Sequence, residues 1–275
     1  MFTLNCKGRL LVVDKPVVMG IINITPDSFY AGSQKASVDE ALQVAENMLD
    51  DGAAVLDIGG QSTRPGSVRI SAGEEIDRTL PVIEAIHKNF PQAFVSVDTY
   101  SSAVAGHAVA AGACIVNDIS GGTMDEDMLS TVGGLHVPYI CMHIKGTPET
   151  MQKNPTYENV TREVLDFFIP QLEKCRLQNI HDVIIDPGFG FGKTARHNFQ
   201  LLKDLASFKM LGKPILAGLS RKATIYKTLD ITAEEALNGT TVLNTIALLN
   251  GANLLRVHDV KEAMQAIELV EAYRR

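Results

Sequence analysis

The chain has 275 residues, 45% of them hydrophobic, and 25 Lys and Arg against 32 Asp and Glu give it a formal net charge of −7. The length fits a single α/β barrel of about 250 residues, so we expect one domain over residues 1–275. The apolar fraction excludes an intrinsically disordered chain. The acidic balance argues against a nucleic-acid partner, because coating nucleic acid requires a surplus of Lys and Arg to neutralise phosphates.

The N-terminal sequence and the cysteines favour a reducing compartment. The segment MFTLNCKGRLLVVDK lacks the apolar core of a signal peptide, and no apolar run approaches the ~18 residues that a membrane span needs. The four cysteines form no CxxC pair, which predicts neither a zinc site nor a disulfide framework: Cys6, Cys114, Cys141 and Cys175. We therefore expect a cytoplasmic protein that does not bind a membrane.

The predicted strands begin with two apolar runs at 2–6 and 10–13, which flank Lys7-Gly8 and predict an N-terminal β-hairpin. Eight further runs predict strands, and most are continuously apolar, as expected of parallel strands that are covered by helices. These runs are 17–23, 53–58, 93–98, 113–118, 137–143, 182–186, 214–219 and 252–257.

Amphipathic stretches between these strands predict helices. Capping boxes at 37–40 and 71–74 predict where the first two helices begin. The segment 157–178 also has a helical pattern, which Pro170 is expected to kink or interrupt. Glycines mark three places where a helix should end before the next strand: Gly52, Gly112 and Gly251.

Eight alternating β and α units predict a closed (β/α)₈ barrel of the TIM type, because right-handed crossovers place successive parallel strands side by side. The hairpin is expected to plug the floor of this barrel. An open doubly wound sheet is the alternative, since local patterns do not show whether the sheet closes.

Polar residues lie at the carboxyl ends of the predicted strands, where barrels of this kind carry their chemistry. Their convergence from eight strands predicts a binding site there, whereas one such residue alone would be unremarkable. The residues are Asn23, Asp57, Thr63, Arg64, Asp98, Asn117, Asp118, His143, Asp186, Ser220, Arg221, Lys222, Arg256, His258 and Asp259.

The charges at these ends suggest a ligand with two unlike halves. Asp98, Asn117 and Asp186 offer several acceptors, which suit an electron-poor heterocycle with N–H donors. Lys222, Arg256 and His258 follow the last two strands, where barrels often bind phosphate, and suit a diphosphate.

Two glycine-rich loops belong to the same end. The run PGFGFGKT at 187–194 is not a phosphate loop, because Pro187 stands where that motif requires glycine. Its glycines still allow the backbone to approach a ligand. The other loop, GGQSTRPG at 59–66, carries Arg64 and is expected to fold over a substrate.

The motifs at the strand ends form an ordered set over about residues 16–260: NITPDSF (23–29), DIGGQSTRPG (57–66), VDT (97–99), NDISGG (117–122), MH (142–143), DPGFGFGK (186–193), SRK (220–222) and RVHDV (256–260). Together they resemble the dihydropteroate synthase family, whose members are (β/α)₈ barrels that usually form homodimers.

The resemblance implies a transferase of folate biosynthesis that joins hydroxymethyl-dihydropterin pyrophosphate to para-aminobenzoate, uses Mg²⁺ and is a sulfonamide target. The family's pterin contacts fall on Asp98, Asn117, Met142, Asp186 and Lys222. Its pyrophosphate contacts fall on Asn23, which is also the implied Mg²⁺ ligand, and on Arg64, Arg256 and His258. Its aminobenzoate contacts fall on Thr63, Pro65, Phe191 and Ser220. The implied catalytic residues are Asp98, Asp186, Lys222, Arg256 and His258.

Two other functions compete with this interpretation. A corrinoid-linked methyltetrahydrofolate methyltransferase would share the pterin contacts but would not need the cations at Arg64, Lys222, Arg256 and His258. A non-catalytic pterin-binding protein is suggested by Ala31, which stands where the family commonly has an acidic residue in its first loop.

Overall fold

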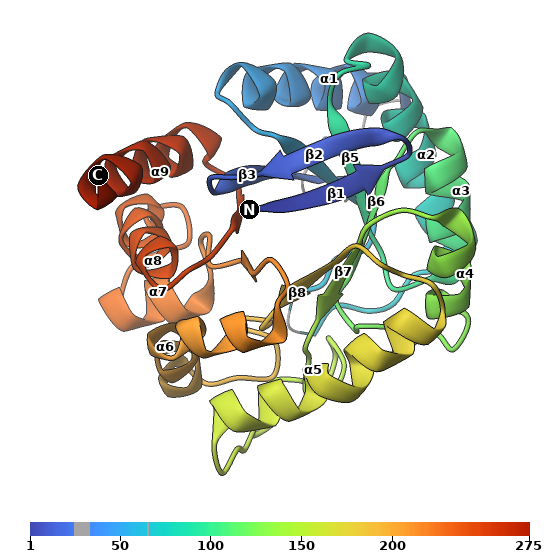
Figure 1. Ribbon diagram of the computed structural model, residues 1–275. Coiled ribbons are helices and arrows are strands. Elements are labelled where there is room, and N and C mark those ends of the chain that lie inside the picture. Colours follow the sequence, from blue (N-terminus) through green and yellow to red (C-terminus); the bar gives the residue numbers. More distant parts are fainter. Residues whose placement is uncertain (25–33, 65) are drawn as a thin grey trace.

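The strands form a closed ring that is surrounded by helices (Figure 1). The computed structural model describes residues 1–24, 34–64 and 66–275, with the backbone alone at 34–37. The parallel strands pair in the order β8-β7-β6-β5-β4-β3-β10-β9, and a bridge between Ile185 and Ile215 joins β8 to β9. The predicted (β/α)₈ barrel is confirmed, and the open-sheet alternative is wrong. Its strands are β3 (Val17–Asn23), β4 (Val55–Gly59), β5 (Phe94–Asp98), β6 (Ile115–Asp118), β7 (Tyr139–Met142), β8 (Val183–Asp186), β9 (Leu216–Ala217) and β10 (Leu254–Val257).

The helices lie outside the ring, and a short 3₁₀ helix, η1 (Leu205–Leu211), follows α6. Ser71 caps α2 by accepting a hydrogen bond from the Glu74 backbone N–H at 3.2 Å, as predicted. The helices are α1 (Gln34–Asp50), α2 (Ala72–Asn89), α3 (Ser102–Ala111), α4 (Met128–Leu135), α5 (Val160–Leu177), α6 (Ala195–Lys203), α7 (Ala223–Leu229), α8 (Leu237–Leu249) and α9 (Val260–Arg274).

One predicted helix start needs correction, and a second helix continues through the proline that was expected to kink or interrupt it. Helix α1 begins at Gln34, so the predicted start at Ser37 is wrong. Helix α5 runs through Pro170 without interruption. A proline removes one helical hydrogen bond, and here the buried face of α5, which includes Val164 and Phe168, offsets that loss.

The inner face of the barrel has an apolar floor. Successive side chains of a strand point to opposite faces, so one residue in two points into the barrel. The hairpin of β1 (Phe2–Cys6) and β2 (Arg9–Val13) lies across the ring in Figure 1. Its Leu4, Cys6, Leu11 and Val13 pack against this floor, so the predicted plug is confirmed. The floor consists of Met19, Val55, Ile115, Ile140, Ile184, Leu216 and Leu254.

A polar layer lies two residues farther along the same strands and therefore on the same inner face. It contains Asp57 above Val55, Asn117 above Ile115, Asp186 above Ile184 and Arg256 above Leu254. The outward residues form a second core with the helices. The fold thus directs the polar ends of the strands toward one shared space.

Two general expectations can be checked against this structure. All four cysteines are buried and free of disulfides. Over residues 1–24, 34–64 and 66–275, every helix is too short or too polar to cross a bilayer.

Adjacent glycines in α4 provide a matched test of the packing. A Cβ at Gly133 would lie 2.0 Å from the Gln178 carbonyl oxygen, whereas a Cβ at Gly134 would meet no atom within 4 Å. We expect Gly133→Ala to lower the free energy of unfolding by about 2 kcal/mol, because the backbone must move. Gly134→Ala should leave it unchanged or raise it by up to about 1 kcal/mol through helix propensity. Urea denaturation gives the free energy of unfolding of both variants. Equal changes in the two variants would contradict the close contact between Gly133 and Gln178.

Candidate active site

The centre of the polar layer is an ion-pair network between strands far apart in the sequence. Arg256 Nε donates to Asp57 Oδ2 at 2.6 Å, and Arg256 Nη2 donates to Asp98 Oδ2 at 2.5 Å. Asn117 Nδ2 donates to the same Asp57 oxygen at 2.9 Å. Asp57 is completely buried, so this network ties β4, β5, β6 and β10 together above the floor.

The network leaves two carboxylate oxygens without a partner. Asp57 Oδ1 and Asp98 Oδ1 are buried and accept no hydrogen bond from any described residue. Burial raises the pKa of Asp98 to about 7, although the charge of Arg256 acts in the opposite direction. An unpaired buried acceptor is costly, so a ligand that brings N–H donors to this place would bind favourably.

A second group of side chains faces this network from β8 and from the chain after β9. Lys222 Nζ donates to the Phe189 carbonyl oxygen at 2.5 Å and lies 4.6 Å from the centroid of the Phe191 ring. A Cβ on Gly218 would lie 3.6 Å from Lys222 Nζ and 3.9 Å from Asp186 Oδ2, so the missing side chain leaves Lys222 and Asp186 close together. Burial lowers the pKa of Lys222 to about 8.

An apolar wall stands beside these charges. Met142 and Phe191 are buried in one cluster at the carboxyl end of the barrel, together with Tyr100, Ile119 and Met151. A flat ring between this wall and the carboxylates would have apolar contact on one side and hydrogen-bond acceptors on the other.

The remaining basic side chains lie toward the opening of the barrel. His258 Nδ1 is 3.0 Å from the buried Ser220 Oγ, which also accepts the backbone N–H of His258. Desolvation first, and then the charges of Arg256, Arg221 and Arg64, lower the pKa of His258. Arg64 is exposed, and Arg221 is held by Asp259 in a two-bond ion pair at 2.9 and 2.7 Å. The imidazole of His258 is therefore neutral at pH 7, and the exposed Arg64 supplies the charge that favours an anion here.

The chain matches known proteins over nearly its whole length. Residues 19–258 match the family model described as "Pterin binding enzyme". The chain is 41% identical over 271 residues to dihydropteroate synthase from Escherichia coli (strain K12), a match that covers 98% of this chain and 95% of the relative. The chain belongs to the dihydropteroate synthase family.

Further relatives and solved structures agree. The dihydropteroate synthase of Haemophilus influenzae is 40% identical over 98% of both chains. The Yersinia pestis enzyme, solved with a sulfonamide drug complex, superposes with a TM-score of 0.94 at 39% identity over 99% of both chains. The Xanthomonas albilineans enzyme with 7,8-dihydropteroate superposes with a TM-score of 0.89 at 36% identity over 99% of this chain and 98% of that one. The predicted membership in this family of transferases is confirmed.

The structure brings most of the predicted dihydropteroate synthase residues to one end of the barrel. Asn23, Asp98, Met142 and Asp186 are the last residues of their strands, and Asn117 and Arg256 lie one residue before theirs end. Thr63 is half-buried in the β4–α2 loop, and Pro65 and Ala31 lie outside the described residues.

Arg256 is shared between the two halves of the predicted site. We predicted it among the cations that face a diphosphate, and two of its nitrogens also pair with Asp57 and Asp98. The alternation of β10 explains this, because Arg256 follows the inward-pointing Leu254 by two residues and so points into the barrel. The two halves of the predicted site therefore meet at this guanidinium.

Two buried carboxyl groups of the site were not assigned a role by the sequence. Asp57 was noted only as a strand end, although its place two residues after Val55 was a usable signal. Glu75 of α2 is 4% exposed, its Oε1 accepts no hydrogen bond from the described residues, and its charge acts on Asp98. Nothing in the sequence distinguished Glu75 from an ordinary helix-surface residue.

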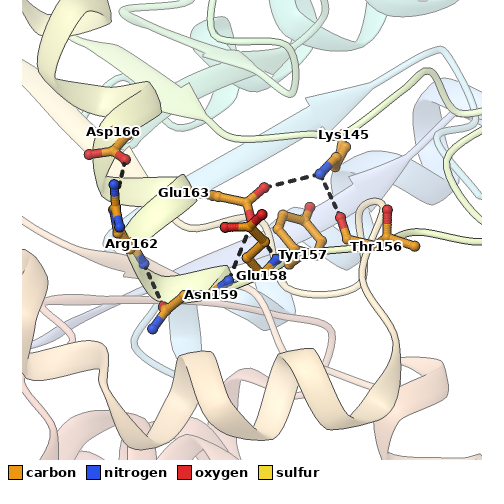
Figure 2. A pocket seen from close by; sticks show the side chains of 8 residues that line it. All are labelled: Lys145, Thr156, Tyr157, Glu158, Asn159, Arg162, Glu163 and Asp166. Carbon is orange, nitrogen blue, oxygen red and sulfur yellow. Dashed lines mark hydrogen bonds and ion pairs between the residues drawn. The ribbon is translucent and has the colours of Figure 1, made fainter.

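A separate hollow of about 430 Å³ lies where α5 begins, and Figure 2 shows its walls. None of the predicted site residues lines it. Its Lys145 is already paired, because Nζ donates to Glu163 Oε2 at 3.1 Å and to the Thr156 carbonyl oxygen at 2.6 Å. We therefore place the chemistry at the barrel opening.

Glu75 predicts a pH dependence of stability. Burial raises its pKa from 4.5 to about 7, so the folded chain holds a proton between these values that the unfolded chain releases. Stability is therefore lost as the pH rises from 5 to 8. Glu75→Gln should remove this loss and gain on the order of 2 kcal/mol over wild type between pH 5 and 8. Urea denaturation at pH 5 and pH 8 gives the free energy of unfolding of both proteins. If the difference between variant and wild type were the same at both pH values, Glu75 would not be the group that titrates.

Proposed function

We propose that this chain joins hydroxymethyl-dihydropterin pyrophosphate to para-aminobenzoate, giving dihydropteroate and pyrophosphate. The observation that carries the proposal is the pair of buried, unpartnered acceptors on Asp57 and Asp98, at the end of the barrel that also carries an apolar wall and basic side chains. The pterin ring of this substrate has N–H donors for the carboxylates and a flat face for the apolar wall. The pyrophosphate attached through its methylene group suits the basic side chains.

The pterin ring would lie above the apolar floor. Asp98, Asn117 and Asp186 would accept and donate hydrogen bonds at its edge, Met142 would cover one face, and Lys222 would lie beside the ring. Asp57 belongs to this group through its bonds to Arg256 and Asn117. Filling the empty acceptor positions recovers the cost of burying these carboxylates.

The pyrophosphate would leave toward Asn23, Arg64, Arg256 and His258. The carbon–oxygen bond of the pterin methylene breaks and its electron pair departs with pyrophosphate, whose growing charge these residues stabilise. Positive charge then spreads over the pterin ring, where ionised Asp98 and Asp186 face it. The nitrogen lone pair of the amine forms the new carbon–nitrogen bond, and the amine releases a proton to water.

The residues at the rim fit Mg²⁺ as a cofactor. Mg²⁺ prefers oxygen ligands and is usually bound by one or two protein groups together with substrate phosphates and water. Asn23 offers such an oxygen, because its Oδ1 lies 3.6 Å from the position of a Cβ on Gly59 and thus close to Asp98, whose Oδ1 has no partner among the described residues. Those residues contain no cluster of three or more His, Cys, Asp or Glu that would enclose a metal. When bound, the ion would neutralise pyrophosphate charge.

The aminobenzoate would lie between Thr63, Phe191 and Ser220, with Pro65 beyond the described residues. Phe191 provides a buried aromatic surface next to Lys222, and Ser220 is held by His258. An aromatic amine is a weak nucleophile, so holding it in line with the methylene carbon contributes more than removing its proton. Sulfonamides, which mimic aminobenzoate, would bind in the same place.

We also propose that the chain works as a homodimer in the cytoplasm. Helix α8 exposes Val242, Ile246 and Leu249, spaced four and three residues apart and therefore on one face, with 49%, 37% and 47% of their surface accessible. An apolar stripe of this kind suits contact with a second copy. The four free, buried cysteines suit a reducing compartment.

A coupled assay for released pyrophosphate tests the reaction directly. Purified protein with both substrates and Mg²⁺ should release pyrophosphate in step with dihydropteroate, and omission of either substrate or of Mg²⁺ should reduce the rate at least tenfold. Binding of the pterin pyrophosphate without product over hours would indicate a non-catalytic pterin-binding protein.

Asp98→Asn should lower kcat at least about 100-fold, because it removes the charge that faces the developing cation. The variant should remain folded, since the amide oxygen can still accept from Arg256. Circular dichroism checks the fold and the pyrophosphate assay gives kcat. A near-normal kcat would remove Asp98 from the mechanism.

Ile246→Glu should convert the dimer into a monomer, because a charge in an apolar interface is not compensated. Ile169→Glu on α5 is the matched control, since Ile169 is 58% exposed on another helix. Sedimentation velocity distinguishes the two forms. If Ile169→Glu dissociated the dimer and Ile246→Glu did not, the interface would involve α5 in place of α8.

A further inference from the structure

The lysine near the end of the glycine-rich loop 187–194 is turned into the protein. Lys193 is only 2% exposed, and its Nζ donates to the carbonyl oxygens of Gly188 at 2.9 Å and Phe191 at 3.1 Å. It also lies 2.9 Å from His143 Nδ1 at the end of β7. Burial lowers the pKa of Lys193, and the polar contacts of its amino group all lie inside the protein.

The backbone of this loop needs such a partner. Gly188, Gly190 and Gly192 have φ values of +71°, +87° and +64°, which side-chain-bearing residues rarely adopt. A Cβ at Gly188 would lie 1.9 Å from the His143 carbonyl oxygen, so the loop is pressed against the chain after β7. The Gly188 carbonyl oxygen also accepts the Phe191 backbone N–H at 3.1 Å, whereas among the described residues the Phe191 carbonyl oxygen is paired through Lys193 alone.

The same loop carries three contacts of the active site. The Gly188 N–H donates to Asp186 Oδ1 at 2.7 Å. The Phe189 carbonyl oxygen accepts from Lys222 Nζ, and the Phe191 ring lies against that ammonium. Lys193 therefore lies behind the loop whose front holds Asp186, Lys222 and the aromatic wall.

The outer side of the loop is held by weaker contacts. Tyr157 OH donates to the Gly192 carbonyl oxygen at 2.9 Å. Lys145 Nζ lies 4.1 Å from the Tyr157 ring, and Figure 2 shows these two side chains side by side. Lys145 is exposed, and exposed pairs contribute little. The buried bonds of Lys193 restrain the loop from inside, as does the buried Asn198, whose Oδ1 accepts the Gly190 N–H at 2.8 Å. Lys145 is a matched control.

We propose that Lys193, with His143, is a positioning residue that fixes the loop 187–194 so that Phe191 and Lys222 face the aminobenzoate and the pterin. The proposal rests on the proposed function. It assigns to the lysine of the glycine-rich motif a buried structural contact in place of a phosphate contact.

A tryptophan reporter tests the position of the loop without any reaction. The chain contains no tryptophan, so Phe191→Trp introduces a single tryptophan at the wall, which can be excited apart from the tyrosines. Adding Lys193→Met should raise acrylamide quenching of this fluorophore at least twofold and shift its emission to the red. Adding Lys145→Met should change neither. Equal quenching in all three proteins would overturn the proposal.

A double-mutant cycle separates positioning from stability. Lys193→Met should raise KM for aminobenzoate at least tenfold and lower kcat less. In a Phe191→Leu background the same change should raise KM less than threefold, because the wall it positions is already lost. Lys145→Met should leave KM within twofold of wild type. Lys193→Gln, which keeps two N–H donors, should give an intermediate KM and serves if Lys193→Met does not fold.

The outcomes distinguish the two proposals. A lower free energy of unfolding with KM unchanged would make Lys193 merely structural, and equal rises of KM in both backgrounds would show that it does not act through Phe191. If wild type releases no pyrophosphate, the proposed function fails, whereas the fluorescence result still decides whether Lys193 holds the loop.

Discussion

The alternation of side chains along short parallel strands is the constraint on which the site depends. Each strand that turns an aliphatic residue inward at the floor turns its next inward residue into the polar layer. Ile184 and Asp186, or Leu254 and Arg256, are successive steps of this kind. The same register that packs the hairpin against the floor therefore places the carboxylates and the guanidinium above it, and a shift by one residue would remove both.

The carboxylates of this layer are only partly paired. Arg256 compensates Asp57 and Asp98 through one oxygen of each carboxylate, and the other oxygen of each has no partner among the described residues. A protein optimised for stability alone would pair or remove such atoms. The cost is consistent with a site that completes its hydrogen bonds only when a ligand with N–H donors is bound, and it explains why burial raises the pKa of Asp98.

Most of the architecture followed from the sequence because it depends on local periodicity. All eight barrel strands were predicted within two residues at either end, and the hairpin and the cap at Ser71 were also found. The partners of Arg256 were not predicted, because Asp57 lies 199 residues away and pairing across a barrel has no local signal in the sequence. Glu75 was missed for the same reason. The start of α1 was misplaced because a capping pattern at 37–40 competes with helix propensity upstream, and Pro170 was tolerated because tertiary burial outweighs one lost bond.

The hairpin that closes the floor also determines where the chain can be extended. Met1 is 90% exposed beside the hairpin, and Arg274 near the other terminus donates to the Leu248 carbonyl oxygen at the end of α8, just before the chain enters β10. Both termini therefore emerge at the base of the cylinder (Figure 1). A purification tag, a fused domain or a solid support attached at either terminus would leave the opposite mouth unobstructed, which makes this scaffold convenient for immobilised measurements of ligand binding.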